Sequence, residues 1–183
     1  MTPEEALALV RERRIVPFAD FVRAVAGGPV KGSWWGHPRG HEIFNLAGFV
    51  HRESTFVKLV AGKETILHES VYPAFARVVT DEEWRRPRIA ALSKEARALL
   101  RAVEKAGTLR VDELARKKGV KVSALSKVRN ELRKALLVHA DEEHTEKGHH
   151  VTVLVAWGKW VTPGVAKAAK KLSLEEALAE IGA

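Results

Sequence analysis

The feature that most constrains this 183-residue chain is the order of helix and strand signals between residues 93 and 157. A helical pattern covers 93–105 and stops at Gly107, a short extended piece covers 108–111, and a second helical segment, 112–118, ends at Gly119. A third helix is expected over 122–136, followed by a polar hairpin over 138–157. The sequence therefore predicts the order helix, strand, helix, helix, strand, turn, strand.

This order is that of a winged helix, which places its third helix in the DNA major groove and its hairpin against the backbone. In the third predicted helix, apolar residues recur every three or four positions and form one stripe for the core. The other side carries hydroxyl, amide and cationic groups, which suit base edges and phosphates. A solvated helix face is the plainer interpretation. With one residue of the hairpin turn, the predicted nucleic-acid-binding residues are Ser123, Ser126, Lys127, Asn130, Arg133, Lys134 and Lys147.

The charge distribution supports an anionic partner. The net charge is +8, and residues 110–134 hold 9 basic and 3 acidic residues, a local excess of +6. A basic patch of this kind is the electrostatic footprint of a nucleic-acid-binding protein. Double-stranded DNA is therefore the expected partner.

Composition excludes several other classes of protein. The chain is 46% hydrophobic and 30% charged, which is ordinary for a soluble globular protein. No apolar run approaches the roughly 18 residues of a membrane span, and the acidic start is unlike a secretory signal. There is no cysteine and no glutamine, and asparagine occurs only at 45 and 130. Scarce amides are typical of proteins from hot environments. We expect a cytoplasmic protein with no cofactor and no membrane partner.

A similar series of signals fills the first half of the chain. Helices are expected over 2–14, 17–25 and 40–49, then a hairpin of strands 56–60 and 64–68 around a turn at 61–63, then a helix over 71–79. The predicted fold is therefore mainly α (α+β): tandem winged-helix domains, each with three helices and a β-hairpin, and a C-terminal helical tail. The domains are placed at 1–88 and 92–162, with a boundary in the polar stretch 81–87, and the tail at 163–183. Its Ala/Leu pattern, over 164–171 and 174–181, indicates packing on the body or across a homodimer.

Two adjacent tryptophans, on a loop flanked by Gly32 and Gly36, are the least expected feature of the first half. Flat aromatic faces beside cations are what a base-stacking platform needs. We expect at least one of the two rings to line a surface cleft that accepts a flipped base or another planar ligand. Burial of both rings in a core is the alternative. The candidate cleft residues are Trp34, Trp35, His37, His41, Lys58 and His68.

A second polar cluster lies in the hairpin of the second half. His139, His144, His149 and His150 accompany several carboxylates there, and such groups can bind a metal ion. Polar residues are also ordinary in such a hairpin, and we expect no metal. The chain has no Gly-rich phosphate loop of the Walker spacing. The zinc motif that His41 and Glu42 begin lacks its second histidine, because Asn45 stands there.

The segment 58–73, with Thr65-Ile66-Leu67-His68 at its centre, resembles the AlkZ-like bacterial DNA glycosylases. That family is built from tandem winged helices with a basic hairpin of the form Arg-Gly-Thr-Leu-His, so the resemblance implies a DNA-binding scaffold. Its members use paired glutamines for catalysis, and this chain has no glutamine. The stretch Ser33 to Pro38 also resembles a motif of a small uncharacterised prokaryotic family, which suggests no activity.

The sequence therefore predicts a nucleic-acid-binding winged-helix protein, most simply one that binds double-stranded DNA in regulation or repair. One alternative is a glycosylase-like repair enzyme, in which Trp34 or Trp35 holds an extruded base and a histidine or carboxylate supplies acid–base catalysis. Another is a winged-helix scaffold for protein–protein assembly. Fold alone does not decide among these functions.

Overall fold

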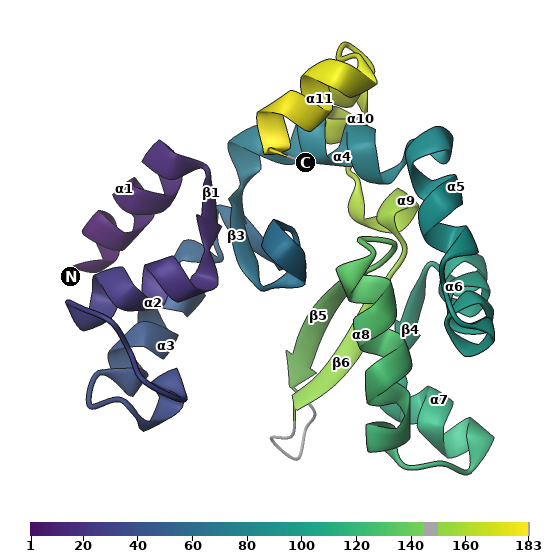
Figure 1. Cartoon of the computed structure of the whole chain (residues 1–183), viewed down its shortest axis with the longest axis horizontal. Coiled ribbons are helices and arrows are strands. Elements are labelled where there is room, and N and C mark those ends of the chain that lie inside the picture. Colours follow the sequence, from purple (N-terminus) through teal and green to yellow (C-terminus); the bar gives the residue numbers. More distant parts are fainter. Residues whose placement is uncertain (145–149, 183) are drawn as a thin grey trace. The chain divides into compact units, whose positions relative to one another are not determined.

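The computed structural model describes residues 1–144 and 150–182, without the side chain of His144, and divides the chain into two compact units (Figure 1). Unit 1 comprises Met1–Tyr72 and the residues from Glu180 onward, and unit 2 comprises Pro73–Ala179. Lys147 and His149 lie outside the described residues, so the expectations for them stay predictions. The predicted domain limits at 88, 92 and 162 also stay predictions.

Unit 1 begins with a helix whose start is fixed by local chemistry. The Thr2 hydroxyl accepts a hydrogen bond from the Glu5 backbone at 3.2 Å, and the Glu5 carboxylate accepts one from the Thr2 backbone at 2.7 Å. This capping box, with Pro3 at the first helical position, satisfies groups that a helix start leaves free. The elements are α1 (Pro3–Arg13), β1 (Ile15–Pro17), α2 (Phe18–Ala26), η1 (Trp34–Gly36), α3 (Gly40–Val50), β2 (Ser54–Val57), η2 (Val60–Gly62), β3 (Thr65–His68) and η3 (Glu69–Val71).

The sheet of unit 1 is antiparallel with strand order β1-β3-β2. Ile66 at its centre pairs with Val16 of β1 and with Phe56 of β2. The strand β1 was not predicted, because two apolar residues are too short a run to show a strand period. The chain turns at 61–63 as predicted, where the Lys63 N–H donates to the Val60 carbonyl at 2.9 Å, but β2 ends earlier and β3 begins later than predicted, and they are joined by residues 58–64, which include η2. Val10, Phe21, Ile43 and Ile66 form the centre of a core from which solvent is excluded.

Unit 2 contains a helix where a polar boundary was predicted. The Asp81 carboxylate accepts a hydrogen bond from the Trp84 backbone at 3.0 Å and so caps helix α5, whose Trp84 side chain is buried. Residues 82–87 of this stretch are therefore helical. The elements around and after it are α4 (Tyr72–Val79), α5 (Glu82–Ala90), α6 (Lys94–Ala106), β4 (Thr108–Arg110), α7 (Val111–Lys118), η4 (Val122–Leu125), α8 (Ser126–Lys134), β5 (His139–His144), β6 (His150–Val155), α9 (Trp157–Trp160), α10 (Pro163–Ala169) and α11 (Leu174–Ile181).

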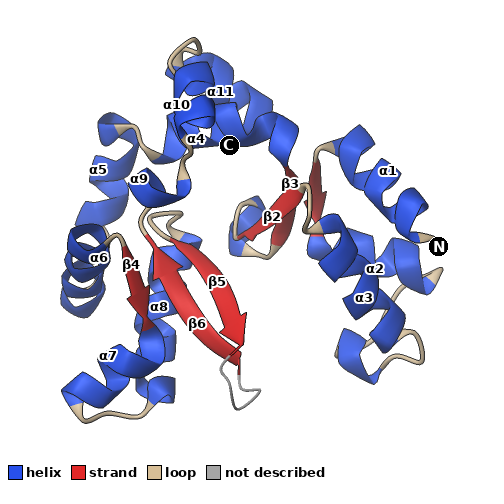
Figure 2. Ribbon diagram, turned by 180° about the vertical axis from the view of Figure 1, so that it is seen from behind, coloured by secondary structure: helices blue, strands red, loops and turns tan. Residues whose placement is uncertain are grey.

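The predicted helix over 122–136 divides into η4 and α8 and ends earlier than expected. Leu136 has a φ of +54°, outside the helical region, so the chain leaves the helix before it. The indole N–H of Trp157 donates to the Leu136 carbonyl at 2.7 Å, which holds this corner from within the core. The strands of unit 2 form an antiparallel sheet of order β4-β6-β5 (Figure 2).

The two units share one element order. Helix, strand, helix, helix, strand, strand describes both α1-β1-α2-α3-β2-β3 and α6-β4-α7-α8-β5-β6. In each sheet the first and second strands of the unit flank the third. The fold is mainly helical with two small antiparallel sheets, so the predicted α+β class is confirmed. No helix in the described part of the chain is long and apolar enough to cross a membrane.

Candidate functional site

Helix α8 of unit 2 presents its polar side to solvent because its apolar side is fixed in the core. Leu132 is fully buried, and Leu125 and Val128 are partly buried against the same cluster. Exposed cations lie along α7, the following turn and α8, and we call them the cationic face. Its members are Arg116, Lys117, Lys118, Lys121, Lys127 and Lys134.

The carboxylates near this face are already bound to other groups. Arg110 contacts Asp112 at 3.1 Å and Glu113 at 3.6 Å, and its hydrogen bond lowers the pKa of Asp112. Glu131 accepts hydrogen bonds from the backbone and hydroxyl of Ser93, at 2.6 and 2.8 Å. Among the described residues, no member of the cationic face takes part in an ion pair. Their positive charge is therefore not neutralised within the described part of the chain.

The predicted nucleic-acid-binding residues fall on or beside the cationic face. Ser123, Lys127 and Lys134 are exposed. Ser126, Asn130 and Arg133 are half-buried on the same helix or at its start, and Lys147 lies outside the described residues. Whether these residues contact nucleic acid stays a prediction.

Arg129 belongs to the same helix but has a different position. Its guanidinium donates to the Thr152 hydroxyl of β6 at 2.8 Å, and burial together with the nearby Arg133 charge lowers its pKa. In the sequence Arg129 is one of the nine basic residues of 110–134. In the structure it ties α8 to the sheet and orients the cationic face.

The described part of the hairpin is acidic, not basic. Asp141, Glu142 and Glu143 of β5 are exposed, and Glu142 contacts His150 at 3.3 Å. His139 lies at the other end of β5, where it is buried with its ring centroid 5.7 Å from that of Trp157. His139 and His150 therefore do not share a site, and phosphate contact by β5 is unfavourable.

A stack of three aromatic rings lies in unit 1, and we call it the aromatic ledge: Trp34, Trp35 and Phe44. The ring centroids are 4.6 Å apart between the two indoles and 5.3 Å apart between Trp35 and Phe44, with interplanar angles of 19° and 29°. Phe18 meets Trp34 edge-on and anchors it to the core. Trp35, the middle ring, is 54% exposed, and Phe44, which ends the stack, is 47% exposed.

The ledge depends on a close approach of backbone to backbone. The Gly40 N–H donates to the His37 carbonyl at 2.7 Å, which closes the turn of η1 onto the first residue of α3. A β-carbon at Gly40 would lie 2.8 Å from the Trp35 carbonyl oxygen and 3.1 Å from that of Trp34. Glycine is required here because such contacts are shorter than packed atoms allow.

The candidate cleft residues do not form a single cleft in unit 1. Trp34 lines a groove of about 560 Å³ with Phe18, Val22, Val30 and Lys63, but the other five candidates, all described by the structure, do not. The His41 ring meets Trp35 edge-on, with centroids 6.3 Å apart, and so belongs beside the ledge. Lys58 pairs with Glu64 at 3.3 Å, and His68 lies in a separate cluster.

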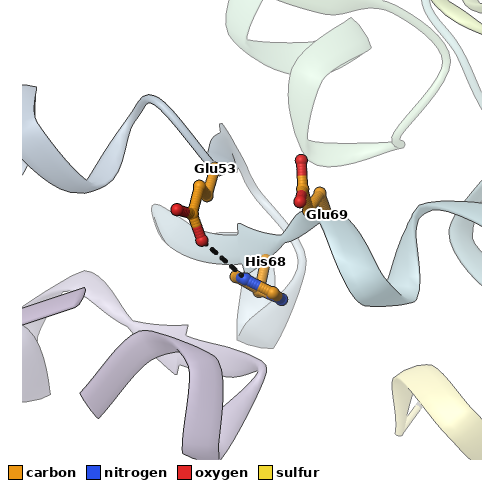
Figure 3. Close-up of side chains that lie close together, drawn as sticks. All are labelled: Glu53, His68 and Glu69. Carbon is orange, nitrogen blue, oxygen red and sulfur yellow. Dashed lines mark ion pairs between the residues drawn. The ribbon is translucent and has the colours of Figure 1, made fainter. Parts of the chain in front are cut away.

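That cluster contains Glu53, His68 and Glu69 (Figure 3). The Nε2 atom of His68 is buried and lies 3.5 Å from a Glu53 carboxylate oxygen. Arg11 donates to Glu53 at 2.7 Å, and this hydrogen bond lowers the pKa of Glu53. The Glu69 backbone N–H donates to the Glu53 carbonyl at 2.8 Å, so the three residues are held together by the main chain as well.

The hydrogen bonds of the cluster fit a histidine–carboxylate pair better than a metal site. The Nδ1 atom of His68 accepts from the Ser70 backbone N–H at 3.2 Å, which assigns the proton of the neutral ring to Nε2, facing Glu53. A metal would need the Nε2 lone pair, and it would compete with Arg11 for Glu53. Burial and the nearby Glu69 charge raise the pKa of the Tyr72 hydroxyl, which therefore stays protonated.

The sequence indicated only one member of this cluster. His68 stood out at the end of a predicted strand, whereas Glu53 and Glu69 had no motif around them. The strand pairing supplies the missing signal, because Ser54 lies opposite His68 and brings the residue before β2 next to the end of β3. A predicted hairpin that paired residue 54 with residue 68 would have placed Glu53 beside His68.

Comparisons with known proteins agree with the resemblance in the hairpin segment. A family model described as AlkZ related matches residues 1–183, which is the whole chain. No curated protein and no solved structure matches. The match extends the resemblance from one hairpin to both units, and the chain belongs to the AlkZ-related family.

Proposed function

We propose that this protein binds double-stranded DNA, with the cationic face of α7 and α8 against the phosphates and base edges. The observation that carries the proposal is a set of six exposed cations outside the ion pairs of the described residues. When lysine and arginine side chains neutralise DNA phosphates, the counterions condensed on the DNA are released, and this release drives binding. Membership of a family related to AlkZ supports DNA as the anionic polymer.

We also propose that the two units are tandem winged helices. The shared element order and the shared strand order support this interpretation. In unit 2 it makes α8 the helix that enters the major groove, with Lys127 and Asn130 at the centre of the contact. The β5–β6 hairpin takes the position of the wing, but the acidic residues of β5 do not favour phosphate contact there. Regulation and repair both remain within this proposal.

The test removes three charges from the proposed contact. The variant Lys121→Ala, Lys127→Ala, Lys134→Ala is compared with the wild type for binding to a short duplex across a salt series. The slope of log affinity against log salt is expected to become shallower by roughly 0.9 for each phosphate that the variant no longer neutralises. Affinity at low salt is expected to fall at least tenfold.

A matched variant controls for net charge. Lys94→Ala, Lys105→Ala, Lys170→Ala removes the same charge from exposed positions on α6 and after α10. It is expected to change the salt slope much less. Equal slopes for the two variants, both folded by circular dichroism, would refute a specific contact at the cationic face.

A second candidate function is hydrolysis of a glycosidic bond, and the Glu53–His68–Glu69 cluster favours it. His68 and Arg11 hold Glu53 in place, and Glu69 is the exposed carboxylate that a substrate can reach. Release of a base from alkylated duplex DNA tests this function. Activity that survives both Glu69→Gln and His68→Asn would exclude the cluster from catalysis.

A further inference from the structure

The aromatic ledge occupies the place in unit 1 that the proposed contact helix occupies in unit 2. In both units a 3₁₀ turn leads into the helix that precedes the hairpin: η1 precedes α3, and η4 precedes α8. At this position unit 2 presents Lys127 and Asn130, whereas unit 1 presents Trp35 and Phe44. The same part of the fold therefore carries cations in one unit and aromatic faces in the other.

The ledge is prepared for a planar ligand. Trp34 at one end of the stack is fixed by Phe18, Trp35 lies in the middle, and Phe44 at the other end is 47% exposed. The neighbouring rings are already roughly parallel, so a further planar group can extend the stack without moving the fold. Exposed aromatic rings forgo the stabilisation that burial would give, and an exposed apolar patch of this kind marks a binding surface.

The charges around the ledge suit a ligand that carries phosphate. Residues 31–52 contain three basic residues and one acid. That acid, Glu42, is bound by Arg39 and by the amino terminus of Met1, the latter at 3.6 Å. Lys31 and His41 are both exposed, and the His41 ring meets Trp35 edge-on, so His41 lies directly beside the ledge.

We propose that the aromatic ledge binds an unpaired nucleobase of DNA, which stacks on Phe44 at the open end of the ledge, with Trp35 supporting Phe44 from behind. DNA as the polymer rests on the proposed function, whereas the preference for an unpaired base rests on the ledge alone. In a paired duplex both faces of each base are covered by its neighbours, so only a bulged, frayed or single-stranded base can stack there. The protein therefore distinguishes DNA with a local defect from an intact duplex.

The test measures a ratio of two affinities. Dissociation constants are determined for an intact duplex and for the same duplex with an unpaired thymidine bulge. The wild type is expected to bind the bulged duplex more tightly, by roughly fivefold to 100-fold, as stacking of one base supports. Trp35→Ala and Phe44→Ala are expected to lower this ratio towards one, and Trp35→Phe to preserve most of it.

The controls separate this proposal from the proposed function. Val122→Ala removes an exposed apolar side chain from unit 2 and is expected to leave the ratio unchanged. The triple lysine variant is expected to weaken binding to both duplexes and to leave the ratio intact. An equal decrease of affinity for both duplexes in Trp35→Ala, with the ratio unchanged, would refute base selection while leaving duplex binding in place.

The alternative to a nucleobase is that a second copy of the chain covers the aromatic ledge. Sedimentation velocity of the wild type and Trp35→Ala tests this occupant directly. A wild-type dimer that Trp35→Ala dissociates, together with a wild-type affinity ratio of one, would overturn the proposal. A sedimentation coefficient that Trp35→Ala leaves unchanged, with an affinity ratio that depends on Trp35, is the expected result.

Discussion

The two units carry one topology and present different chemistry at the same point of it. Both have a sheet in which the third strand lies between the first two, and both have a 3₁₀ turn before the helix that precedes the hairpin. In unit 2 the glutamate of α8 binds the N-cap residue of α6, and the cationic face takes part in no ion pair among the described residues. In unit 1 the corresponding turn stacks two indoles on Phe44. The scaffold supplies a position, and the side chains at that position determine what can bind there.

The strongest way to break this comparison is to disrupt one unit and observe the other. Leu132→Ala removes a fully buried side chain of α8, and Ile43→Ala does the same in α3. Each is expected to cost roughly 2–5 kcal/mol of stability, because a buried cavity remains. Hydrogen exchange should show that Leu132→Ala loosens mainly 92–155 and Ile43→Ala mainly 3–68. Uniform loosening of the whole chain by either variant would mean that the units unfold as one.

The tryptophans of the two units should differ in what they contribute to stability. Trp157 is buried and its indole N–H satisfies the Leu136 carbonyl, whereas Trp35 is largely exposed. Trp157→Phe is expected to cost roughly 1–3 kcal/mol, since it leaves a buried carbonyl without a donor. Trp35→Phe should change stability by less than about 0.5 kcal/mol, as exposed substitutions usually do. Thermal denaturation of the two variants measures the contrast, and equal decreases in stability would contradict it.

Gly40 tests the part of the comparison that concerns unit 1, because its missing β-carbon allows the turn of η1 to pack against α3. Gly40→Ala forces a β-carbon against the Trp35 carbonyl and is expected to cost about 1–3 kcal/mol, the usual penalty of overpacking. The turn must shift, so tryptophan emission should change as well. Gly48→Ala in the same helix is the matched control: nothing lies within 4 Å of its added β-carbon, so alanine should stabilise the helix by up to about 1 kcal/mol. Identical stability of the two variants would show that the close approach does not matter.

The sequence predicted helices better than it predicted sites. Amphipathic spacing and caps located α1, α6 and the C-terminal helices, because these signals are local. The strand β1 was missed, since its pairing with β3 depends on residues about fifty positions away. The tryptophan pair was noticed from composition, but its stacking on Phe44 follows from the fold of η1 against α3. The partner of His68 was missed for the same reason: Glu53 reaches it only through the register of β2 and β3.

The smallest expected effect concerns acid stability at the start of α5. The Trp84 backbone N–H and Arg77 lower the pKa of Asp81, so this carboxylate stabilises the folded chain when it is ionised. Since the folded pKa lies below the unfolded one, near 3.9, the contribution is complete above that value and disappears as the pH falls through the folded pKa. Asp81→Ala is expected to cost about 0.5–2 kcal/mol at neutral pH, as the loss of a helix cap does. Melting temperatures from pH 7 down to about pH 2 should converge for the two proteins as Asp81 becomes protonated. Arg11 lowers the pKa of Glu53 in unit 1 in the same direction, so Glu53→Gln should show the same convergence there. A constant difference across the whole pH range would mean that the capping oxygen acts without its charge.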